Sequence, residues 1–480
     1  MRDYLLLYVN GVRREIRGAR AFRSLSDYLR YELRHTGTKV VCAEGDCGSC
    51  SVLLGRLEEG QLVYHGVTSC IQFLYQLDGA HVITVEGLRS LEAMHPVQTA
   101  MVACHGAQCG FCTPGFVVAM AGMYESHEKI GEPIIRRELV GNLCRCTGYE
   151  AIINAGLAVD PAKVKRANEL YPPMSIIADI ERTCCEPVEL RGDDGRIAFI
   201  PTTLAEAAAF KAQRPDCLPY AGGTDLGVQI NKGRRDPMEV LVLGHLRELR
   251  TTRVTADAVT IGAAVTWTAL ERQTADTIPE FSRMLGRFAS PPLKNAGTIG
   301  GNIANGSPIA DSLPALYVLE AQVELTSVRG TRTVAMTGFF TSYKRSVMAA
   351  DELISRVIIP RPAEGQTLKL YKISKRHDLD ISTFTAAFLL ERDGDHIASI
   401  RIAYGGVAGT VLRLPEVEAW LAGQPISEDT FIEAGERAAT AITPLSDVRG
   451  SAAYRSRLAA NIFVKLYHDL TEQSAAVEVR

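Results

Sequence analysis

The chain of 480 residues is long enough for several domains, each with a core of its own. Its 52 basic and 55 acidic residues leave a formal net charge of −3, so the sequence offers no basic field and we expect no nucleic-acid partner. The hydrophobic fraction of 46% is ordinary for a soluble globular protein.

No segment has the pattern of a secretory signal or a membrane span. The apolar run that follows Met1 is too short for a signal peptide. The stretch 101–124 lacks Asp, Glu, Lys and Arg, but it contains His105, Gln108, Pro114 and two of the clustered cysteines, so a membrane span here would put a metal-ligand loop in the bilayer core. Because cysteines are clustered and no secretory signal is present, we expect a reducing, cytoplasmic location without a membrane.

The first part of the chain reads mostly as short strands. One helix fits between Leu25 and Leu33, and Asn10-Gly11 between apolar residues is a strong hairpin signal. From about residue 90 the apolar period becomes helical. Helices are predicted to begin near Pro96 and Pro114 and to cover 134–140 and 149–159.

The stretch 160–195 has several prolines, many charges and no clear period, which predicts a linker. A mixed α/β pattern then begins near Phe199, with a helix over 205–213, strands at 241–243 and 259–261, and a helix that ends at Arg287. Near Leu368 the pattern changes again, and a strand over 399–407 precedes helices to about Glu472.

Eight of the twelve cysteines form two spaced sets. The first set has the spacing C-x4-C-x2-C-x19-C of a plant-type [2Fe–2S] site and consists of Cys42, Cys47, Cys50 and Cys70. Gly45 and Gly48 let its loop fold tightly and direct N–H groups at sulfur. The second set has the spacing C-x2-C-x31-C-x-C and consists of Cys109, Cys112, Cys144 and Cys146.

Two such sets in one chain predict an electron relay. Structural zinc is the alternative, and it stays more open for the second set, whose spacing is not diagnostic. Cys104 reads as a surplus helix thiol, Cys217 as a core residue, and Cys184-Cys185 as two incidental thiols. The histidines are scattered without a nucleophile motif nearby, so no catalytic triad is predicted.

Two glycine-rich segments follow, at 220–226 and 295–308, and neither matches G-x-G-x-x-G or a Walker A loop. Their N–H groups can form an anion-binding concavity, although a tight turn also explains the first segment. Because both segments follow two cluster sites in the chain, they suggest a binding site for the pyrophosphate of a flavin dinucleotide. A flavin suits this place because it accepts single electrons and releases them as a hydride.

Several motifs carry a resemblance to a known family. Residues 109–115 (CGFCTPG), 141–149 (GNLCRCTGY), 221–225, 300–311 and 371–382 are similar to motifs of the molybdenum hydroxylases, which include xanthine dehydrogenase and aldehyde oxidase. The resemblance covers essentially the whole chain and implies an α+β multidomain fold. The implied parts are a β-grasp plant-type ferredoxin domain (1–88), a four-helix-bundle [2Fe–2S] domain (89–160), a linker (161–195), an α+β FAD-binding domain of the xanthine dehydrogenase/vanillyl-alcohol-oxidase type (196–367) and a C-terminal α/β flavin subdomain (368–480).

The resemblance also implies an oxidoreductase function, that of the electron-transfer subunit of a bacterial xanthine dehydrogenase. Xanthine or hypoxanthine would be hydroxylated at a molybdopterin centre on a large partner subunit. Electrons would pass to the second cysteine set, then to the first, then to FAD and finally to NAD. The family further implies a heterotetramer of two small and two large subunits, with no catalytic residue on this chain.

The residues that would contact FAD are assigned in this chain by their position relative to the family's motifs. Ile354 and Lys372 would lie near the flavin ring, and Phe288 would lie beside the isoalloxazine or, alternatively, be a core residue at a helix end. The full set is Pro219, Tyr220, Ala221, Gly222, Gly223, Thr224, Asp225, Leu226, Phe288, Thr298, Gly301, Asn302, Asn305, Ser307, Asp311, Ile354 and Lys372.

Two departures from the family pattern stand out. Glu150-Ala151-Ile152 replaces the usual Arg-Pro-Ile after the second set, and Leu379 occupies a position that is acidic in some animal members and linked there to the nicotinamide acceptor. The second departure, at Leu379, concerns the choice of NAD as the electron acceptor. Two alternatives remain: the same relay serving an aldehyde, nicotinate or an aromatic acyl-CoA, and a stand-alone redox carrier or flavin sensor.

Overall fold

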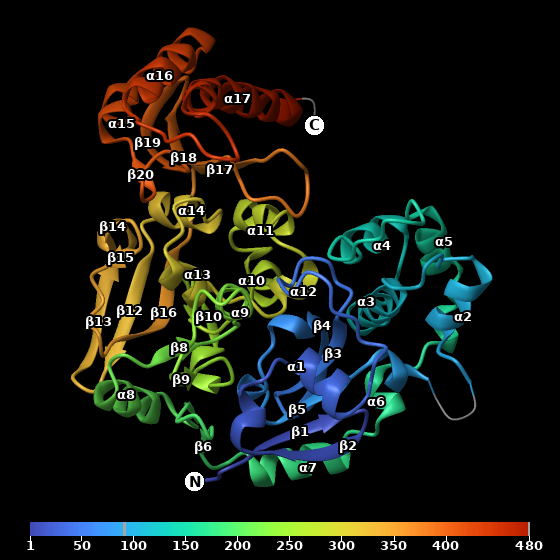
Figure 1. Cartoon of the computed structure of the whole chain (residues 1–480). Helices are drawn as coiled ribbons and strands as arrows, with labels where there is room; N and C mark the ends of the chain where they lie inside the picture. The colour runs from blue at the N-terminus through green and yellow to red at the C-terminus, as the bar shows by residue number, and fades with distance from the viewer. Residues whose placement is uncertain (90–92, 479–480) are drawn as a thin grey trace. The chain divides into compact units, whose positions relative to one another are not determined.

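The computed structural model describes residues 1–89 and 93–478. Residues 90–92, in the predicted second domain, and 479–480, in the predicted last subdomain, lie outside the described residues. The chain divides into two compact units (Figure 1). The first unit comprises Met1–Arg250, Thr266–Thr268 and Ala289–Gly301, and the second comprises Thr251–Val265, Ala269–Phe288 and Asn302–Arg480.

The first unit opens with a mixed five-stranded sheet in the order β2-β1-β5-β3-β4, in which β1 and β5 are parallel. Its strands are β1 Leu5–Val9, β2 Val12–Ile16, β3 Ser51–Glu58, β4 Gln61–Thr68 and β5 Ala80–Ile83. The predicted hairpin is confirmed, because Asn10 and Gly11 connect β1 and β2 with φ of 47° and 78°. The predicted helix is α1 Leu25–Asp27, which continues into a π-helical turn over Tyr28–Glu32.

A group of helices follows the sheet, and the structure confirms all four that the sequence predicts. They are α2 Pro96–Ala103, α3 Thr113–Ser126, α4 Glu132–Glu138 and α5 Glu150–Ala158. A proline lies in the first turn of α2, α3 and α4, where its missing N–H is not needed. Helix α3 packs against β3 and β4, so the helices and the sheet share one apolar core.

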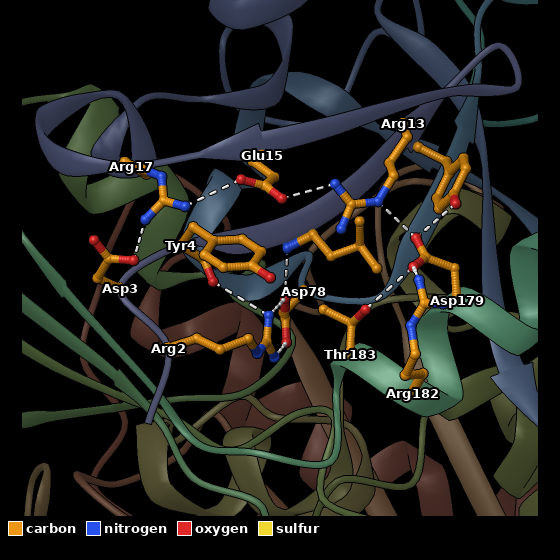
Figure 2. A network of polar contacts seen from close by, with 12 residues as sticks. Arg2, Asp3, Tyr4, Arg13, Glu15, Arg17, Asp78, Asp179, Arg182 and Thr183 are labelled. Carbon is orange, nitrogen blue, oxygen red and sulfur yellow. Dashed lines mark hydrogen bonds and ion pairs between the residues drawn. The ribbon is translucent and has the colours of Figure 1, made fainter.

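The stretch 160–195, expected as a linker, differs from that expectation because it is largely ordered. It holds α6 Ala167–Leu170, α7 Met174–Thr183 and β6 Val188–Arg191. Ile176 and Ile180 of α7 are buried in the core shared by the first sheet and the helices. Figure 2 shows the polar contacts that hold α7 there, where the Asp179 carboxylate accepts bonds from Tyr8 Oη and Arg13 Nε, each at 2.7 Å.

A second sheet completes the first unit, in the order β6-β7-β9-β8. Its other strands are β7 Ile197–Ile200, β8 Leu218–Tyr220 and β9 Glu239–Val242, and the helices nearby in sequence are α8 Leu204–Gln213 and α9 Leu226–Asn231. A short helix, α12 Pro291–Lys294, and the start of α13 Ile299–Asn305 also belong to this unit. The predicted helix over 205–213 is confirmed as α8, whose Thr203 cap accepts a bond from the Glu206 N–H.

The second unit contains an antiparallel sheet in the order β10-β11-β16-β12-β13 and a small pair, β14 and β15. Their bounds are β10 Thr252–Val254, β11 Ala258–Gly262, β12 Gln322–Ser327, β13 Gly330–Ala335, β14 Phe340–Ser342, β15 Arg345–Ser346 and β16 Leu353–Pro360. Helices in this part of the chain are α10 Trp267–Thr274, α11 Pro279–Gly286 and α14 Ser312–Val318.

The end of the second unit is a four-stranded antiparallel sheet, β17-β18-β19-β20, with three helices packed on it (Figure 1). The strands are β17 Gln366–Ile373, β18 Phe384–Asp393, β19 His396–Gly405 and β20 Leu412–Arg413, and the helices are α15 Pro415–Leu421, α16 Glu428–Thr440 and α17 Ala452–Glu478. Among the described residues no helix combines the length and the apolar character that crossing a bilayer requires.

Candidate functional site

The first cysteine set lies on a tight loop and on a short 3₁₀ turn in the first unit. The loop 42–50 leads into β3, and Cys70 lies in the turn Ser69–Ile71 that follows β4. Gly45 and Gly48 have φ of 77° and 68°, which confirms that the loop needs residues tolerant of the left-handed region. Three of the four thiols are buried, namely those of Cys47, Cys50 and Cys70.

Three hydrogen bonds connect the four thiols of this set. Hydrogen bonds link Cys42 to Cys47, Cys42 to Cys70, and Cys50 to Cys70. The bonds from the Cys47 and Cys70 thiols lower the pKa of Cys42, and the bond from Cys70 lowers the pKa of Cys50. The Glu44 N–H also donates to Cys42 Sγ at 3.4 Å, as predicted for this loop. The bonds between the thiols also raise the pKa of Cys47 and of Cys70, because these thiols act as the donors.

The second cysteine set lies where helices begin. Cys112 directly precedes α3, and Cys144 and Cys146 precede α5. Its thiols form two pairs, Cys112 with Cys144 and Cys109 with Cys146. Burial and the Cys144 thiol together raise the pKa of Cys112 to about 12.

Thr147 is the main polar neighbour of the second set. Its hydroxyl and its N–H donate to Cys144 Sγ at 3.2 and 3.4 Å. Burial raises the pKa of the Cys144 thiol, but these bonds outweigh it, so that the pKa is lowered. Cys104 lies outside both pairs and packs against the helical core, in keeping with its prediction as a surplus helix thiol.

The pairing of thiols fits the chemistry of a two-iron cluster. Within residues 1–89 and 93–478, no group of three or more His, Cys, Asp or Glu side chains has the arrangement of a site for one metal ion. Each iron of a [2Fe–2S] cluster takes only two protein ligands, and the thiols of the second set form two such pairs. The assignment of the clusters thus depends on the pairs and on the sequence spacing.

The two glycine segments come together in the first unit. A Cβ atom on Gly222 would lie 1.9 Å from the Ala296 carbonyl oxygen, and Gly223 has φ of 72°. Only glycine permits this approach of two main chains. Thr224 lies close to Gly297 in the same contact, and the Thr298 hydroxyl accepts a bond from the Gly301 N–H at 3.1 Å.

The predicted flavin-binding residues of the first unit differ in how accessible they are. Asp225 is exposed, and Pro219, Ala221 and Thr224 are half-buried. The side chain of Tyr220 is fully buried and packs edge-on against Tyr75, with ring centroids 5.1 Å apart. The Tyr220 carbonyl accepts a bond from the Leu243 N–H at 2.7 Å, so neither its ring nor this main-chain group is open to a ligand.

The predicted residues of the second unit centre on a buried ion pair. Lys372 Nζ donates to Asp311 Oδ2 at 2.6 Å, to the Asp380 carbonyl at 3.0 Å and to Ser382 Oγ at 3.0 Å. The Ser382 hydroxyl in turn donates to Asp311 Oδ1 at 2.5 Å. Every donor of the ammonium group thus has a partner.

The remaining predicted residues of the second unit lie on separate elements. Asn302 Oδ1 accepts a bond from the Ser312 hydroxyl at 2.7 Å, and Asn305 and Ser307 are half-buried. Ile354 is 6% exposed on β16, and Phe288 is half-buried just after α11.

The sequence did not predict a role for three polar residues near these sites, namely Asn142, Asn231 and Ser382. Each makes side-chain bonds to a segment distant in sequence or to a predicted site residue. Asn142 and Ser382 lie inside motifs that carry the family resemblance, which was a usable signal. Nothing in the local pattern around Asn231 marks it.

Known protein families match three ranges of this chain. Three family models match: a [2Fe–2S] binding domain at residues 84–157, an FAD binding domain in molybdopterin dehydrogenase at 194–362, and a CO dehydrogenase flavoprotein C-terminal domain at 369–470. Xanthine dehydrogenase 1 of Arabidopsis thaliana is 28% identical over 98% of this chain. The chain belongs to the molybdenum hydroxylase family.

Other molybdenum hydroxylases extend the comparison. Xanthine dehydrogenase of Drosophila subobscura is 30% identical over 96% of this chain. The two matches cover 40% and 39% of those proteins, so the chain spans about two fifths of the length of these curated relatives. Carbon monoxide dehydrogenase from Hydrogenophaga pseudoflava is a structural match with a TM-score of 0.54 and 28% identity, covering 56% of this chain and 94% of that chain.

Quinoline 2-oxidoreductase from Pseudomonas putida 86 is similar to the same degree, with a TM-score of 0.53 and 27% identity over 56% of this chain and 94% of that chain. Within the matched ranges, the [2Fe–2S] model includes the second cysteine set, and the FAD model includes both glycine segments. The three ranges do not include the first set, Cys42 to Cys70. The chain thus carries the iron–sulfur and flavin portion of the family.

Proposed function

We propose that this chain is the electron-transfer subunit of a cytoplasmic xanthine dehydrogenase. In this proposal a large partner subunit carries the molybdopterin centre and hydroxylates xanthine or hypoxanthine. The chain passes the electrons through the second cysteine set, the first set and FAD to NAD. One observation supports this proposal best. The loops of the two thiol sets are hydrogen-bonded to each other, in a chain that also matches an FAD binding domain.

The order of the relay is supported by how the sets are exposed. Cys109 and Cys146 of the second set are exposed, whereas three thiols of the first set are buried. An exposed set can receive electrons from another protein, while a buried set is suited to internal transfer. When bound, each cluster carries one electron at a time and FAD collects two, so FAD can convert single-electron arrivals into a hydride for NAD.

The roles of the chain's own residues follow from this proposal. The two thiol sets hold the clusters, and N–H groups such as that of Glu44 stabilise negative charge on sulfur. The contact between Gly222 and Ala296 shapes the main chain that would bind the FAD pyrophosphate. In the second unit, the Lys372 and Asp311 pair and the other predicted residues would hold the rest of the dinucleotide.

Composition of the purified full chain tests the relay. We expect about four irons with matching sulfide, as two [2Fe–2S] clusters require, together with one FAD. Two zinc ions and no flavin would contradict the proposal.

A second candidate function keeps the relay and changes the substrate. It is favoured by the structural likeness to carbon monoxide dehydrogenase and quinoline 2-oxidoreductase. Co-expression with a molybdopterin subunit, followed by turnover assays, separates the two candidates. Activity with xanthine and NAD supports the first, whereas activity with quinoline, an aldehyde, nicotinate or an acyl-CoA supports the second. A chain that co-purifies with no such subunit would instead be a stand-alone redox carrier.

A further inference from the structure

Helix α9 connects the first cysteine set with the first glycine segment. Its last residue, Asn231, donates from Nδ2 to the carbonyl oxygen of Cys70 at 2.8 Å and to that of Ala43 at 2.9 Å. Cys70 is a predicted cluster ligand, and Ala43 directly follows another, Cys42. One amide group therefore ties together two stretches of chain that carry cluster ligands and lie far apart in sequence.

At one point the same helix packs on the stretch that follows Cys70 with no side chain of its own between the backbones. A Cβ atom on Gly227 would lie 2.7 Å from the Ile71 carbonyl oxygen, so the helix backbone rests directly on the residue after Cys70. Val228 packs against Cys50 and Cys70 in the same small apolar cluster. At Gly227 the backbone of α9 therefore lies directly on the residue after Cys70, and the Val228 side chain fills the neighbouring contact with the first set.

The other end of α9 continues from the first glycine segment. The Gly227 N–H donates to the Gly223 carbonyl at 2.7 Å, and Gly222 and Gly223 form the contact with the second glycine segment. The six residues of α9, Leu226–Asn231, therefore run from the end of the glycine segment to the ligand loops. A helix of this length is about 9 Å long at 1.5 Å per residue.

We propose that α9 is the route by which the first cysteine set is coupled to the flavin, and that Asn231 is a positioning residue for this transfer. The inference rests on the proposed relay function. Asn231 fixes the Cys70 and Ala43 carbonyls against the helix, and Gly227 permits the close approach. One electron leaves the first cluster for each electron that the flavin takes up, so the transfer needs no other reactant.

A physical reason links the two hydrogen bonds to redox behaviour. Partners of the residues that hold a metal centre orient its ligands and tune its potential, and losing them typically costs 10–100-fold in affinity or activity. Here the Asn231 side chain donates to the main-chain carbonyl of the ligand residue Cys70 rather than to its sulfur. Its loss is expected to leave the cluster bound while changing how the cluster is held against α9.

The test uses the full chain with clusters and flavin bound. Asn231→Ala removes both donors, and Asn231→Asp keeps the shape while replacing the donor with a carboxylate. After rapid one-electron reduction, electron transfer from the first cluster to the flavin is expected to slow about tenfold in both variants, the lower end for lost outer-shell partners. The EPR signal and midpoint potential of one cluster are expected to shift, while those of the other cluster stay unchanged.

Two further variants keep the test decisive. Gly227→Ala, which pushes α9 away from Ile71, is expected to slow the same transfer. Asn168→Ala is the matched control, because Asn168 Nδ2 also donates to one main-chain carbonyl, that of Leu62 at 2.9 Å, away from both cysteine sets. The control is expected to match the wild type in transfer rate and in EPR.

The two proposals fail in different ways. If both Asn231 variants keep iron and flavin and show wild-type EPR and transfer, the role of α9 is wrong while the relay stands. If the wild-type chain binds neither iron nor flavin, the relay itself is wrong.

Discussion

The main-chain N–H of Leu143 donates a hydrogen bond to the carbonyl oxygen of Cys47 at 3.0 Å. Leu143 directly precedes Cys144 of the second set, and Cys47 belongs to the first set. A single hydrogen bond therefore joins the backbones that carry ligands of the two predicted clusters. The Asn142 side chain reinforces this junction, since its Nδ2 donates to the Gly48 carbonyl at 3.1 Å.

Glycine at position 48 is required by this junction for two separate reasons. Its φ is 68°, and a Cβ atom there would lie 2.4 Å from both Asn142 Nδ2 and the Gly141 carbonyl oxygen. Gly148 has the same φ of 68° with nothing within 4 Å. We expect Gly148→Ala to lower the free energy of unfolding by about 1–2 kcal/mol, from backbone conformation alone. Gly48→Ala adds overpacking and is expected to cost about 3 kcal/mol or more.

Urea unfolding and the iron-to-protein ratio measure both glycine variants. Gly48→Ala is expected to lose iron as well as stability, because it separates the loops of the two sets. Equal losses in the two variants would mean that the contact between the loops is not the limiting feature.

Asn142 is the buried polar residue of the junction, with 2% of its surface exposed. Asn142→Ala removes one of three donors to the Gly48 carbonyl, which keeps the Ser51 hydroxyl at 2.7 Å and the Ser51 N–H at 3.1 Å. We therefore expect a loss of about 0.5–1.5 kcal/mol in the free energy of unfolding, the value of a single hydrogen bond. Leu143 still bonds to Cys47 in this variant, and iron binding is expected to persist. Urea unfolding with parallel iron analysis checks both points, and loss of all iron from Asn142→Ala would contradict the second.

His81 predicts a specific dependence of stability on pH. Its ring is fully buried, and burial lowers its pKa from 6.5 to about 4. The Gly11 N–H donates to Nε2 at 3.0 Å, so Nδ1 carries the proton and donates to Tyr64 Oη at 2.7 Å. The other rings packed against it belong to Tyr8 and Tyr171, which are phenols that stay protonated in this range.

Because the folded-state pKa of His81 lies below its unfolded value, the unfolded chain binds a proton that the folded chain does not. The contribution of His81 to stability is therefore complete above pH 6.5 and is lost as the pH falls toward 4. The loss over this window is about 3 kcal/mol. Urea unfolding at several pH values should show it in the wild type and in His377→Gln, an exposed control, but not in His81→Gln. Parallel pH profiles in all three would refute the assignment.

Asp179 holds α7 to the first sheet (Figure 2). Its side chain is 9% exposed and accepts bonds from Tyr8, Arg13 and Arg182. Asp179→Ala leaves the buried Tyr8 hydroxyl unpaired, and we expect a loss of about 2–4 kcal/mol. Asp3, paired with Arg17 and 79% exposed, is the control, and Asp3→Ala is expected to change stability by less than about 0.5 kcal/mol. Limited proteolysis within 160–195 should rise only in the Asp179 variant.

Much of the fold was predictable because its signals are local. The Asn10-Gly11 turn, the prolines at the helix starts and the spacing of the cysteines are all patterns within short stretches. The order of the stretch 160–195 was not predictable, since it depends on Asp179 meeting Tyr8 across 171 positions of sequence. Asn231 was missed for the same reason, because its partners, Cys70 and Ala43, are more than 160 positions away.

The buried pair of Lys372 and Asp311 gives a test that separates a structural role from a cofactor role. Their side chains are 5% and 8% exposed, so removing one partner leaves an unpaired buried charge. We expect Asp311→Asn to lower the free energy of unfolding by about 3–5 kcal/mol. Replacing both, as Lys372→Met with Asp311→Leu, is expected to restore most of the stability, because no charge remains buried.

Flavin content then shows which role the pair has. If these residues hold FAD as proposed, the double variant regains stability in urea unfolding but still releases its flavin on gel filtration. Glu433→Gln provides the control, because its pair with Arg437 is about half exposed and is expected to contribute about 0.5 kcal/mol with no effect on flavin. A stable double variant that retains FAD as tightly as the wild type would show that the ion pair serves the fold alone, and Lys372 and Asp311 would leave the set of flavin-binding residues.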